Sequence, residues 1–437
     1  MSHTAAILDF AAARHTLPPQ ARADAARLLA DTLAGGAAGA ASPEAVKLRP
    51  TLGTGSEARL LSGGTATAAS AAFFNGFAIH CLEWDAVHEP AVVHALSVVT
   101  AALLAASERA GGSDPNDFLT ALAVGVDIAS GLGLCATGPM RFFRPATAGI
   151  IGAALAVARL EGCSRDQFAD VLGLAYSFAG GTMQAHVEAS VALPLQIGRG
   201  SQAAVQAVDL VRVGMDGPHD VLEGPFGYAA LIEPLDLSRY TPTLGQVWRI
   251  SEVSIKPFPS GRASHGALGV LQELRGADVE SIVLHAPPLI HRLVGRPYKT
   301  GAPMSYNRLC LPFLAPLMLR DGVIDPRLTK TDADLAARAS VVLDSNPDGN
   351  ALSPQRLVVT LKDGTLIERQ IDANPGSPAA PMTSAQAAAK YTLCRALAPQ
   401  ADPRIFDAPL AYATNPDSVT PNLFRGPPLR PSDRPSG

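Results

Sequence analysis

Apolar residues recur along most of this chain at the spacing of buried α-helices, and Gly, Pro and Ser fill the intervals between these segments. Before residue 250 the pattern predicts long helices at 19–33, 65–80, 94–110, 116–134, 146–160, 164–179 and 199–214. Ser164 with Gln167 forms a capping-box pattern, and Gly111, Gly162 and Gly214 are expected helix ends. No run before residue 250 alternates like a strand, so a doubly wound sheet is not expected.

The pattern changes near residue 250. Residues 250–258 alternate between apolar and polar side chains, residues 281–287 predict a strand, and residues 356–371 predict a hairpin. Asp363-Gly364 suits the tight turn of that hairpin. Helices are expected between these strands, at 262–275 and 308–320, and residues 377–400 return to a helical pattern.

These elements predict a mainly α protein with a smaller α+β part. A chain of 437 residues exceeds what one hydrophobic core usually fills, so two domains are expected. We expect a large, discontinuous helical domain and an α+β lid domain, followed by a flexible tail rich in Pro, Asp and Arg. The predicted bounds are 1–249 completed by about 379–410 for the helical domain, 250–378 for the lid, and 411–437 for the tail.

Composition narrows the class of protein. Hydrophobic residues make up 47% of the chain and charged residues 17%, which is typical of a well-buried enzyme. The net charge of -4 and the absence of a Lys/Arg run argue against nucleic acid or a membrane as partner. Five cysteines, widely spaced and without a C-x-x-C pair, favour a reducing cytoplasm, and no export signal is expected.

The densest candidate chemistry lies in residues 75–108, where polar groups interrupt an otherwise apolar, helix-prone run. The run contains His80, Glu83, Asp85, His88, Glu89 and His94. Burying such groups without partners would be costly, which indicates a site. We predict that His94 carries a proton and that Asp85 is its partner or a second acid/base group. The alternative is that Asp85 and His94 only cap adjoining helices, and for His80 and Glu83 a structural role is favoured.

Several blocks of the chain resemble the MmgE/PrpD family. The first is NG-(x)3-H-(x)2-E-x-D-(x)2-H, followed by His94 and an Ala-rich helix. Three further blocks agree in order, at 143–160, 195–228 and 256–268. The resemblance implies a helical domain with an α+β lid, a homodimer, a site between the two domains, and no metal or organic cofactor. Members of the family remove water, remove carbon dioxide or invert a centre on small polycarboxylates.

The chain departs from that family at three places. It has Phe143-Arg144-Pro145-Ala146 where a His-Pro-Thr block is usual, and Leu193 and Gln196 where decarboxylase-like members carry Lys and His. Ala95 replaces a common proline. These differences argue against decarboxylation and indicate a divergent subgroup.

Cations for a carboxylate substrate are predicted in the block KPFPSGRASH. Arg262 is expected to grip a carboxylate through two hydrogen bonds, with Lys256 as a point charge and His265 beside them. The resemblance implies a site role for Lys256 as well. The alternative is a solvated loop whose Arg bonds to backbone carbonyls.

The remaining candidates are expected to contact substrate from the helical part. They are His88, Arg144, Gln196 and Arg199, and for the last three a structural salt bridge is the alternative. His186 and Glu188 lie in a loop that could approach the same cleft, but solvation is favoured for both. A metal held by His80, Asp85, His88 and His94 is not expected, because D-x-x-H followed by a distant His does not match a zinc helix.

Together these features predict a cofactor-independent lyase. It would be a hydratase/dehydratase of a small hydroxy-polycarboxylate, similar to 2-methylcitrate dehydratase, in which His94 and Asp85 exchange protons while Lys256 and Arg262 hold carboxylates. An epimerase or isomerase of a dicarboxylate and a noncatalytic carboxylate-binding protein are the rival hypotheses.

Overall fold

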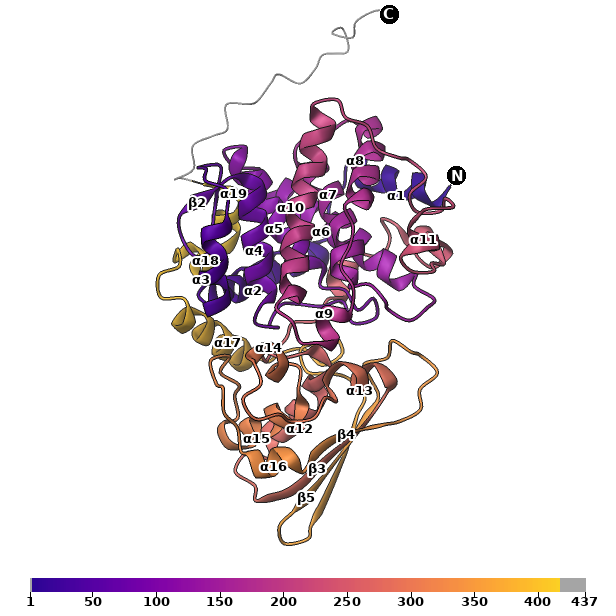
Figure 1. Cartoon of the computed structure of the whole chain (residues 1–437). Helices are drawn as coiled ribbons and strands as arrows, with labels where there is room; N and C mark the ends of the chain where they lie inside the picture. The colour runs from indigo at the N-terminus through magenta and orange to yellow at the C-terminus, as the bar shows by residue number, and fades with distance from the viewer. Residues whose placement is uncertain (1, 417–437) are drawn as a thin grey trace, which may run out of the picture.

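A computed structural model describes residues 2–416 and shows a large helical part above a smaller part that contains a mixed sheet (Figure 1). The helical part contains α1 (His3–Ala12), α2 (Pro19–Ala40), α3 (Pro43–Leu48), α4 (Ala68–His80), α5 (Ala95–Arg109), α6 (Pro115–Leu134), α7 (Arg144–Leu160), α8 (Arg165–Ser177), α9 (Gln184–Val187), α10 (Ala192–Arg212), α11 (Tyr228–Leu231), α17 (Ser384–Leu397), α18 (Arg404–Asp407) and α19 (Pro409–Thr414). The smaller part contains α12 (His265–Glu273), α13 (Pro288–Val294), α14 (Met304–Asn307), α15 (Leu311–Asp321) and α16 (Ala333–Ala337). This architecture confirms the predicted fold class.

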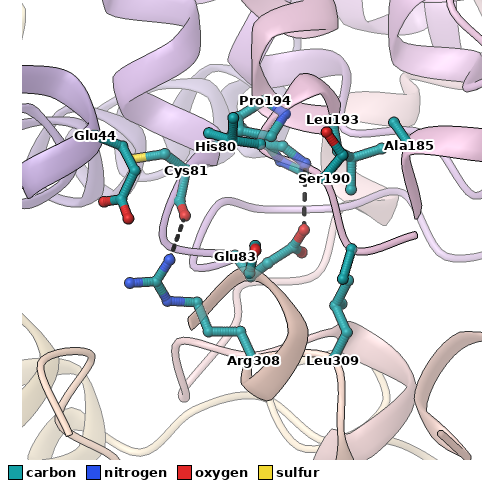
Figure 2. A pocket seen from close by; sticks show the side chains of 13 residues that line it. Glu44, His80, Cys81, Glu83, Ala185, Ser190, Leu193, Pro194, Arg308 and Leu309 are labelled. Atoms are coloured by element: carbon teal, nitrogen blue, oxygen red, sulfur yellow. Dashed lines mark hydrogen bonds and ion pairs between the residues drawn. The ribbon is translucent and has the colours of Figure 1, made fainter. Parts of the chain in front are cut away.

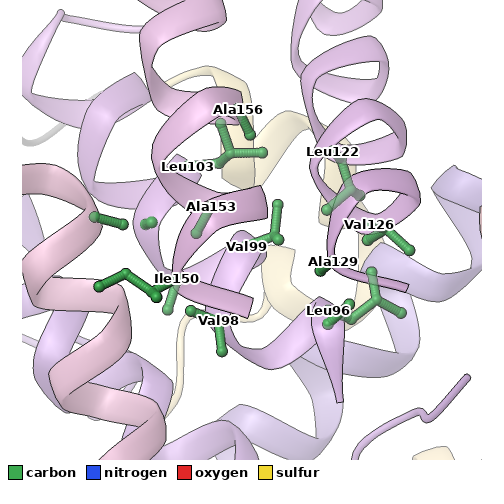
Figure 3. Packing of buried hydrophobic residues seen from close by; sticks show 14 of the residues in the cluster. Leu96, Val98, Val99, Leu103, Leu122, Val126, Ala129, Ile150, Ala153 and Ala156 are labelled. Atoms are coloured by element: carbon green, nitrogen blue, oxygen red, sulfur yellow. The ribbon is translucent and has the colours of Figure 1, made fainter. Parts of the chain in front are cut away.

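The centre of the helical part is built from α4, α5, α6, α7 and α10, which pack against one another. Figure 3 shows Val99 and Leu103 of α5, Val126 of α6 and Ala153 of α7 meeting in this core. Small residues let the backbones approach closely. A Cβ added at Gly152 would lie 2.2 Å from the backbone oxygen of Gly125, so glycine is required where α6 and α7 cross.

The long helices predicted before residue 250 are present, but two of them are longer than expected: α2 continues to Ala40, past the predicted end at 33, and α10 begins at Ala192, before the predicted start at 199. The capping box of Ser164 and Gln167 is present at the start of α8. Gly111, Gly162 and Gly214 follow α5, α7 and α10 with φ of +77°, +71° and +92°, which are left-handed values that favour glycine. Before residue 250 the described chain also contains a two-strand ladder of two residues each, β1 (Ala58–Arg59) with β2 (Thr65–Ala66), which was not predicted.

The sheet of the smaller part has the order β4-β3-β5-β6. Its strands are β3 (Val279–Ala286), β4 (Ala339–Leu343), β5 (Gln355–Leu361) and β6 (Leu366–Ile371). The predicted strand at 281–287 is β3, and the predicted hairpin is β5 with β6, whose turn places Gly364 at φ +88°. Only β3 with β4 is parallel, and β4 was not predicted.

The alternation at 250–258 does not form a strand of the sheet, and that expectation was wrong. The segment runs from a 3-10 turn, η4 (Arg249–Glu252), into an extended stretch. Its backbone groups bond elsewhere: Ser254 N–H donates to Val87 at 2.9 Å, and Ile255 N–H donates to Gly376 at 2.9 Å. The segment therefore links the two parts of the molecule.

The buried apolar side chains form two separate clusters. One takes its members from 7–255, with Leu309 and residues within 394–413, and the other from 258–371. α17 returns the chain to the helical part, where Lys390 Nζ lies 2.6 Å from Asp31 Oδ1 of α2 and donates to the backbone oxygen of Trp84 at 3.2 Å.

The flexible tail expected from 411 begins later than predicted. Residues 411–414 belong to α19, and Tyr412 is buried while its backbone oxygen accepts a hydrogen bond from the Arg59 guanidinium at 2.7 Å. The apolar side chains of Leu410, Tyr412 and Ala413 pack into the core of the helical part. The rest of the predicted tail, 417–437, lies outside the described residues.

α6 is the one helix of the described chain that is long and apolar enough to cross a membrane by length and composition. It lies in the middle of the helical part, and 89% of its most apolar window is buried by the protein itself. This is the position of a core helix.

The ion pair between Lys390 and Asp31 gives a test of how α17 is held. Both side chains are 1% exposed, so Lys390→Met leaves a buried carboxylate uncompensated and should lower the free energy of unfolding of the helical part by about 3–5 kcal/mol. Urea unfolding followed by helical circular dichroism measures the loss. Adding Asp31→Asn should recover part of it, whereas Lys362→Met, in an exposed pair with Asp278, should cost less than about 1 kcal/mol. Equal losses in Lys390→Met and Lys362→Met would contradict this role.

Candidate active site

Asp85 is the centre of a buried cluster of charged groups. The residue is 1% exposed. Its Oδ2 atom lies 2.9 Å from His80 Nδ1 and 3.1 Å from His94 Nδ1, and it accepts a hydrogen bond from the Ser97 hydroxyl. Its Oδ1 atom lies 3.6 Å from the Lys256 ammonium. One carboxylate therefore holds two imidazoles, a hydroxyl and a cation.

Two packed helices position the imidazoles. His80 is the last residue of α4, and His94 is the residue immediately before α5, so the connecting loop brings both rings to the same end of the helical pair. Ser97 lies in the first turn of α5, three residues after His94. The two rings are 4.9 Å apart between centroids and meet edge to face.

Glu83 and Lys256 form the second half of the cluster. Lys256 Nζ is fully buried and donates to the backbone oxygen of Glu83 at 3.1 Å and to its carboxylate at 3.2 Å. The other Glu83 oxygen lies 3.4 Å from His80 Nε2. Glu83 has φ +55°, an uncommon value for a residue with a side chain, and these contacts hold it there.

The neighbouring groups keep both carboxylates ionised. Burial alone would raise their pKa values, but His80, His94 in its protonated form at low pH, and Lys256 outweigh it and lower the pKa of Asp85 well below its ordinary value. For Glu83 the same balance, led by His80 and Lys256, lowers the pKa to about 2. The cluster thus contains two stable anions at neutral pH.

The two histidines differ in protonation. Burial acts to lower the pKa of His80, but Asp85 and Glu83 outweigh it and raise that pKa above 6.5. His94 touches only one of these carboxylates, so burial dominates, Lys256 adds to it, and the pKa of His94 falls below 6.5. At neutral pH the cluster therefore pairs an imidazole that favours the charged form with a neutral one that can accept a proton.

Two adjoining cavities reach this cluster, and His80, Glu83, Leu193 and Leu309 line both. We call the first the arginine pocket; it is also lined by Cys81, Ser190, Ser305 and Arg308 (Figure 2). We call the second the apolar pocket; it is also lined by Val92, His94, Met140, Phe143, Met183, His186, Arg262, Leu293 and Leu352. The empty space of the apolar pocket is about 560 Å³, a figure that includes the part open to solvent.

The structure brings together the three residues predicted to be catalytic, Asp85, His94 and Lys256. It also brings in His80 and Glu83, for which a purely structural role was favoured. Ser97 was missed altogether. Its position one helical turn after His94, in the first turn of a buried helix, is the signal that could have identified it.

Arg262 lines the apolar pocket but already has partners. It pairs with Glu89 at 2.6 Å and donates to the backbone oxygens of Pro375 at 2.6 Å and Asn374 at 3.3 Å. The predicted free carboxylate clamp is therefore occupied by the protein's own groups, because the 89 and 374 segments close around the guanidinium.

His88 and His265 lie outside the cavity linings. His88 Nε2 lies 2.9 Å from a Glu252 carboxylate oxygen, and its Nδ1 accepts a hydrogen bond from the Ala91 N–H at 3.2 Å. His265 is fully buried against Ser260, and burial with the charge of Arg262 lowers its pKa well below the ordinary value. Both rings bond to the protein's own groups and do not line either pocket.

Arg144 does not reach the cavities either. It is 1% exposed and forms a two-pronged ion pair with Glu233, at 2.9 Å and 2.6 Å, while it also donates to the backbone oxygen of Ala91. This is the structural salt bridge weighed as the alternative. The partner, 89 residues away along the chain, could not be identified from the local sequence.

Gln196 and Arg199 line a separate surface depression beside Phe178 and Gly181. Arg199 is exposed and donates to Gln202 at 2.5 Å. Glu188 is also exposed. His186, in contrast, is 5% exposed and lines the apolar pocket, so the solvated alternative is wrong for this residue.

Ligand atoms of His80, Glu83, Asp85 and His94 all lie within 4.8 Å of one another, a grouping that has metal-ligand chemistry. The Lys256 ammonium lies within ion-pair distance of both carboxylates of this group. A divalent cation would have to displace it or accept strong repulsion at this distance. Lys256 therefore already supplies the positive charge that the carboxylates require.

A helical domain and an α+β lid enclose a buried His-Asp-Lys cluster, an arrangement that is capable of acid–base chemistry. Comparison with known proteins agrees with this architecture. The MmgE/PrpD N-terminal domain model matches residues 7–237, and the MmgE/PrpD C-terminal domain model matches residues 258–407. The chain belongs to the MmgE/PrpD family, as its motifs predicted.

Curated relatives include two mammalian enzymes and one fungal protein. Cis-aconitate decarboxylase of Homo sapiens is 28% identical over 58% of this chain and 56% of the relative. The Mus musculus enzyme is 28% identical over 69% of this chain and 66% of the relative, and the cis-aconitate decarboxylase-like protein oryM of Aspergillus oryzae is 28% identical over 47% and 46%. The matches thus span from about half to two thirds of these relatives' lengths.

The protonation of the two histidines can be measured by NMR titration of the imidazole nitrogens. We expect His80 to titrate above pH 6.5 and His94 below it. Asp85→Asn should lower the pKa of His80, because that carboxylate is the main charge raising it. His94→Gln assigns the two signals. Identical titration of both rings in the unsubstituted protein would contradict the assignment.

The competition between Lys256 and a metal gives a second test. We expect purified protein to carry no stoichiometric zinc or iron by elemental analysis, and prolonged chelation to leave its melting temperature unchanged. Lys256→Met should raise the affinity of the cluster for zinc, because the repelling charge is gone while the carboxylates remain. Metal recovered in equimolar amount from the unsubstituted protein would overturn this expectation.

Proposed function

We propose that this protein is a lyase that moves protons beside a carboxylate, without a metal or an organic cofactor. The observation that carries the proposal is the pairing of a neutral His94 with a charge-favouring His80 on one buried carboxylate, at cavities between the two domains. Similarity to cis-aconitate decarboxylases supports a lyase acting on a small carboxylic acid.

The finer proposal is dehydration of a small hydroxy-polycarboxylate of the 2-methylcitrate type. His94 takes a proton from the carbon next to a carboxylate, and the electron pair of that C–H bond forms the new double bond. The C–O bond of the neighbouring hydroxyl breaks, and His80 gives its proton to the departing oxygen, which leaves as water. Asp85 stabilises the imidazolium that His94 becomes.

Lys256 and His80 supply positive charge where the intermediate becomes negative. Both are fixed before reaction by hydrogen bonds or ion pairs to Glu83 and Asp85, so little reorganisation is needed. The missing lysine and histidine at Leu193 and Gln196 remain an argument for water loss over decarboxylation. We further propose a homodimer, as the family resemblance implies. We also propose a cytoplasmic location, from the widely spaced cysteines, and no nucleic-acid or membrane partner, from the net charge of -4.

Removing the central carboxylate should abolish most activity. Asp85→Asn and His94→Gln should each lower kcat by about 10²- to 10⁴-fold in an assay of product absorbance with 2-methylcitrate, citrate and tartrate analogues. Arg320→Ala, on the lid surface, is the control for handling and folding. Silence of the unsubstituted protein across the panel, even at high enzyme concentration, would overturn the lyase proposal. Solvent deuterium entering the substrate without loss of water would identify an epimerase instead.

The pH profile follows from the two imidazoles. kcat/KM should fall as pH drops through the pKa of His94, below 6.5, because the base becomes protonated. It should fall again as pH rises through the pKa of His80, above 6.5, because the acid is lost. In Asp85→Asn the alkaline limb should move to lower pH. An acid limb above pH 6.5 would rule out His94 as the base.

A further inference from the structure

The apolar pocket is charged at one end only. Away from the cluster its walls are aliphatic or aromatic, and they come from both parts of the molecule. The wall residues are Val92, Met140, Phe143, Met183, Leu293 and Leu352. Met140, Phe143 and Leu352 are each less than 9% exposed, so this surface is well protected from water outside the pocket.

The wall on the helical side is held by backbone bonds. Phe143 N–H donates to the backbone oxygen of Gly181 at 2.9 Å, and Met183 N–H donates to Arg141 at 3.0 Å. The two segments that carry Met140, Phe143 and Met183 are therefore joined by backbone hydrogen bonds. A polar ligand group could not be accommodated here by a simple rotation of one loop.

The cations near this wall are already neutralised. Among the described residues that line the apolar pocket, Arg262 is the single Lys or Arg, and it pairs with Glu89 at 2.6 Å. Lys256 lies behind the cluster and pairs with Glu83 and Asp85. A ligand carboxylate that entered between Phe143 and Leu352 would lose its water shell without gaining a counter-charge, which is strongly unfavourable.

Positive charge is available on the other side of His80. Arg308 lines the arginine pocket, is 7% exposed, and donates to the backbone oxygens of Cys81 at 2.9 Å and Pro326 at 3.3 Å (Figure 2). Its Nε atom has no hydrogen-bond partner, and no carboxylate of the described residues pairs with it. Arg308 is the single Lys or Arg among the described residues that line the arginine pocket, and the carboxylates of Glu44 and Glu83 line the same pocket. A ligand that spans both pockets therefore meets this guanidinium beside two anions at one end and hydrocarbon at the other.

His186 adds one neutral polar group to the apolar pocket. Its Nε2 atom is buried and has no hydrogen-bond partner among the described residues. Burial, together with the charge of Arg296, lowers the pKa of His186 to about 4, so the ring is uncharged at neutral pH. A neutral imidazole suits a single hydroxyl or carbonyl oxygen better than an ionised carboxylate.

We propose that the substrate is a hydroxy acid whose carboxylate end faces Arg308 and whose arm in the apolar pocket is a branched alkyl group, where citrate has a carboxylate. This inference deepens the proposed lyase function and rests on it for the reaction, but not for the binding preference. Each methylene of the arm that is buried against this wall should tighten binding about fourfold.

A matched pair of ligands tests the preference. 2-Isobutylmalate and citrate have the same branched skeleton and differ only in whether one arm ends in two methyl groups or in a carboxylate. Titration calorimetry on the full chain should give a Kd for 2-isobutylmalate at least about tenfold lower than that for citrate. Equal affinities, tighter binding of citrate, or binding of neither ligand would overturn the proposal.

A charge placed in the wall should reverse the preference. Leu293 is half-buried on α13 and lines the apolar pocket, so Leu293→Lys adds a cation at modest risk to folding. The ratio of the two Kd values should shift at least about tenfold toward citrate, relative to Leu293→Met, which changes shape without charge. A ratio unchanged between the two variants, with both folded by circular dichroism, would count against the proposed pocket.

Binding and turnover separate the two proposals. If 2-isobutylmalate binds more tightly than citrate but loses no water, the alkyl preference stands and the dehydratase proposal fails. If citrate is both bound and dehydrated in preference, the dehydratase proposal stands and the alkyl preference fails. The same calorimetric samples, assayed for product absorbance, give both readouts.

Discussion

The whole site depends on keeping one carboxylate ionised in the interior of the protein. Asp85 is 1% exposed, and a buried anion is tolerated only where cations and hydrogen-bond donors replace its water. The fold supplies them from separate elements: His80 at the end of α4, His94 and Ser97 at the start of α5, and Lys256 from the segment that enters the lid. The end of α4, the start of α5 and the approach to the lid must therefore meet at one point.

The same constraint gives the two imidazoles different chemistry. His80 lies between two carboxylates. His94 is close to only one, and the charge of Lys256 also lowers the pKa of His94. Glu83 is the second anion beside His80, and its charge raises the pKa of that ring. His80 can therefore act as the acid, while His94 acts as the base. Glu83 accordingly matters to the chemistry although it need not touch a ligand, and its left-handed backbone, φ +55°, is held by Lys256.

The sequence was most informative where interactions are local. Helical spacing and caps predicted the long helices and several of their ends, although α2 and α10 are longer than expected, and the density of His and acid around residue 85 predicted the site. Interactions between distant segments could not be predicted. Arg144 is neutralised by Glu233, and Arg262 by Glu89, so neither guanidinium is available as expected. The alternation at 250–258 is present in the sequence, but its backbone partners lie outside the sheet, at Val87 and Gly376.

These long-range bonds also explain why the site lies between the domains. The loop that carries Asp85 is tied to the 252–262 segment repeatedly: His88 to Glu252, Val87 to Ser254 through paired backbone bonds, and Glu89 to Arg262. Lys256 reaches the cluster from the middle of that segment, so its position is fixed from both sides. A shift of the lid would move Lys256 away from Asp85 and Glu83 and leave both anions under-compensated. Electrostatics at the cluster therefore stabilises the relative position of the two domains, in addition to providing the chemistry.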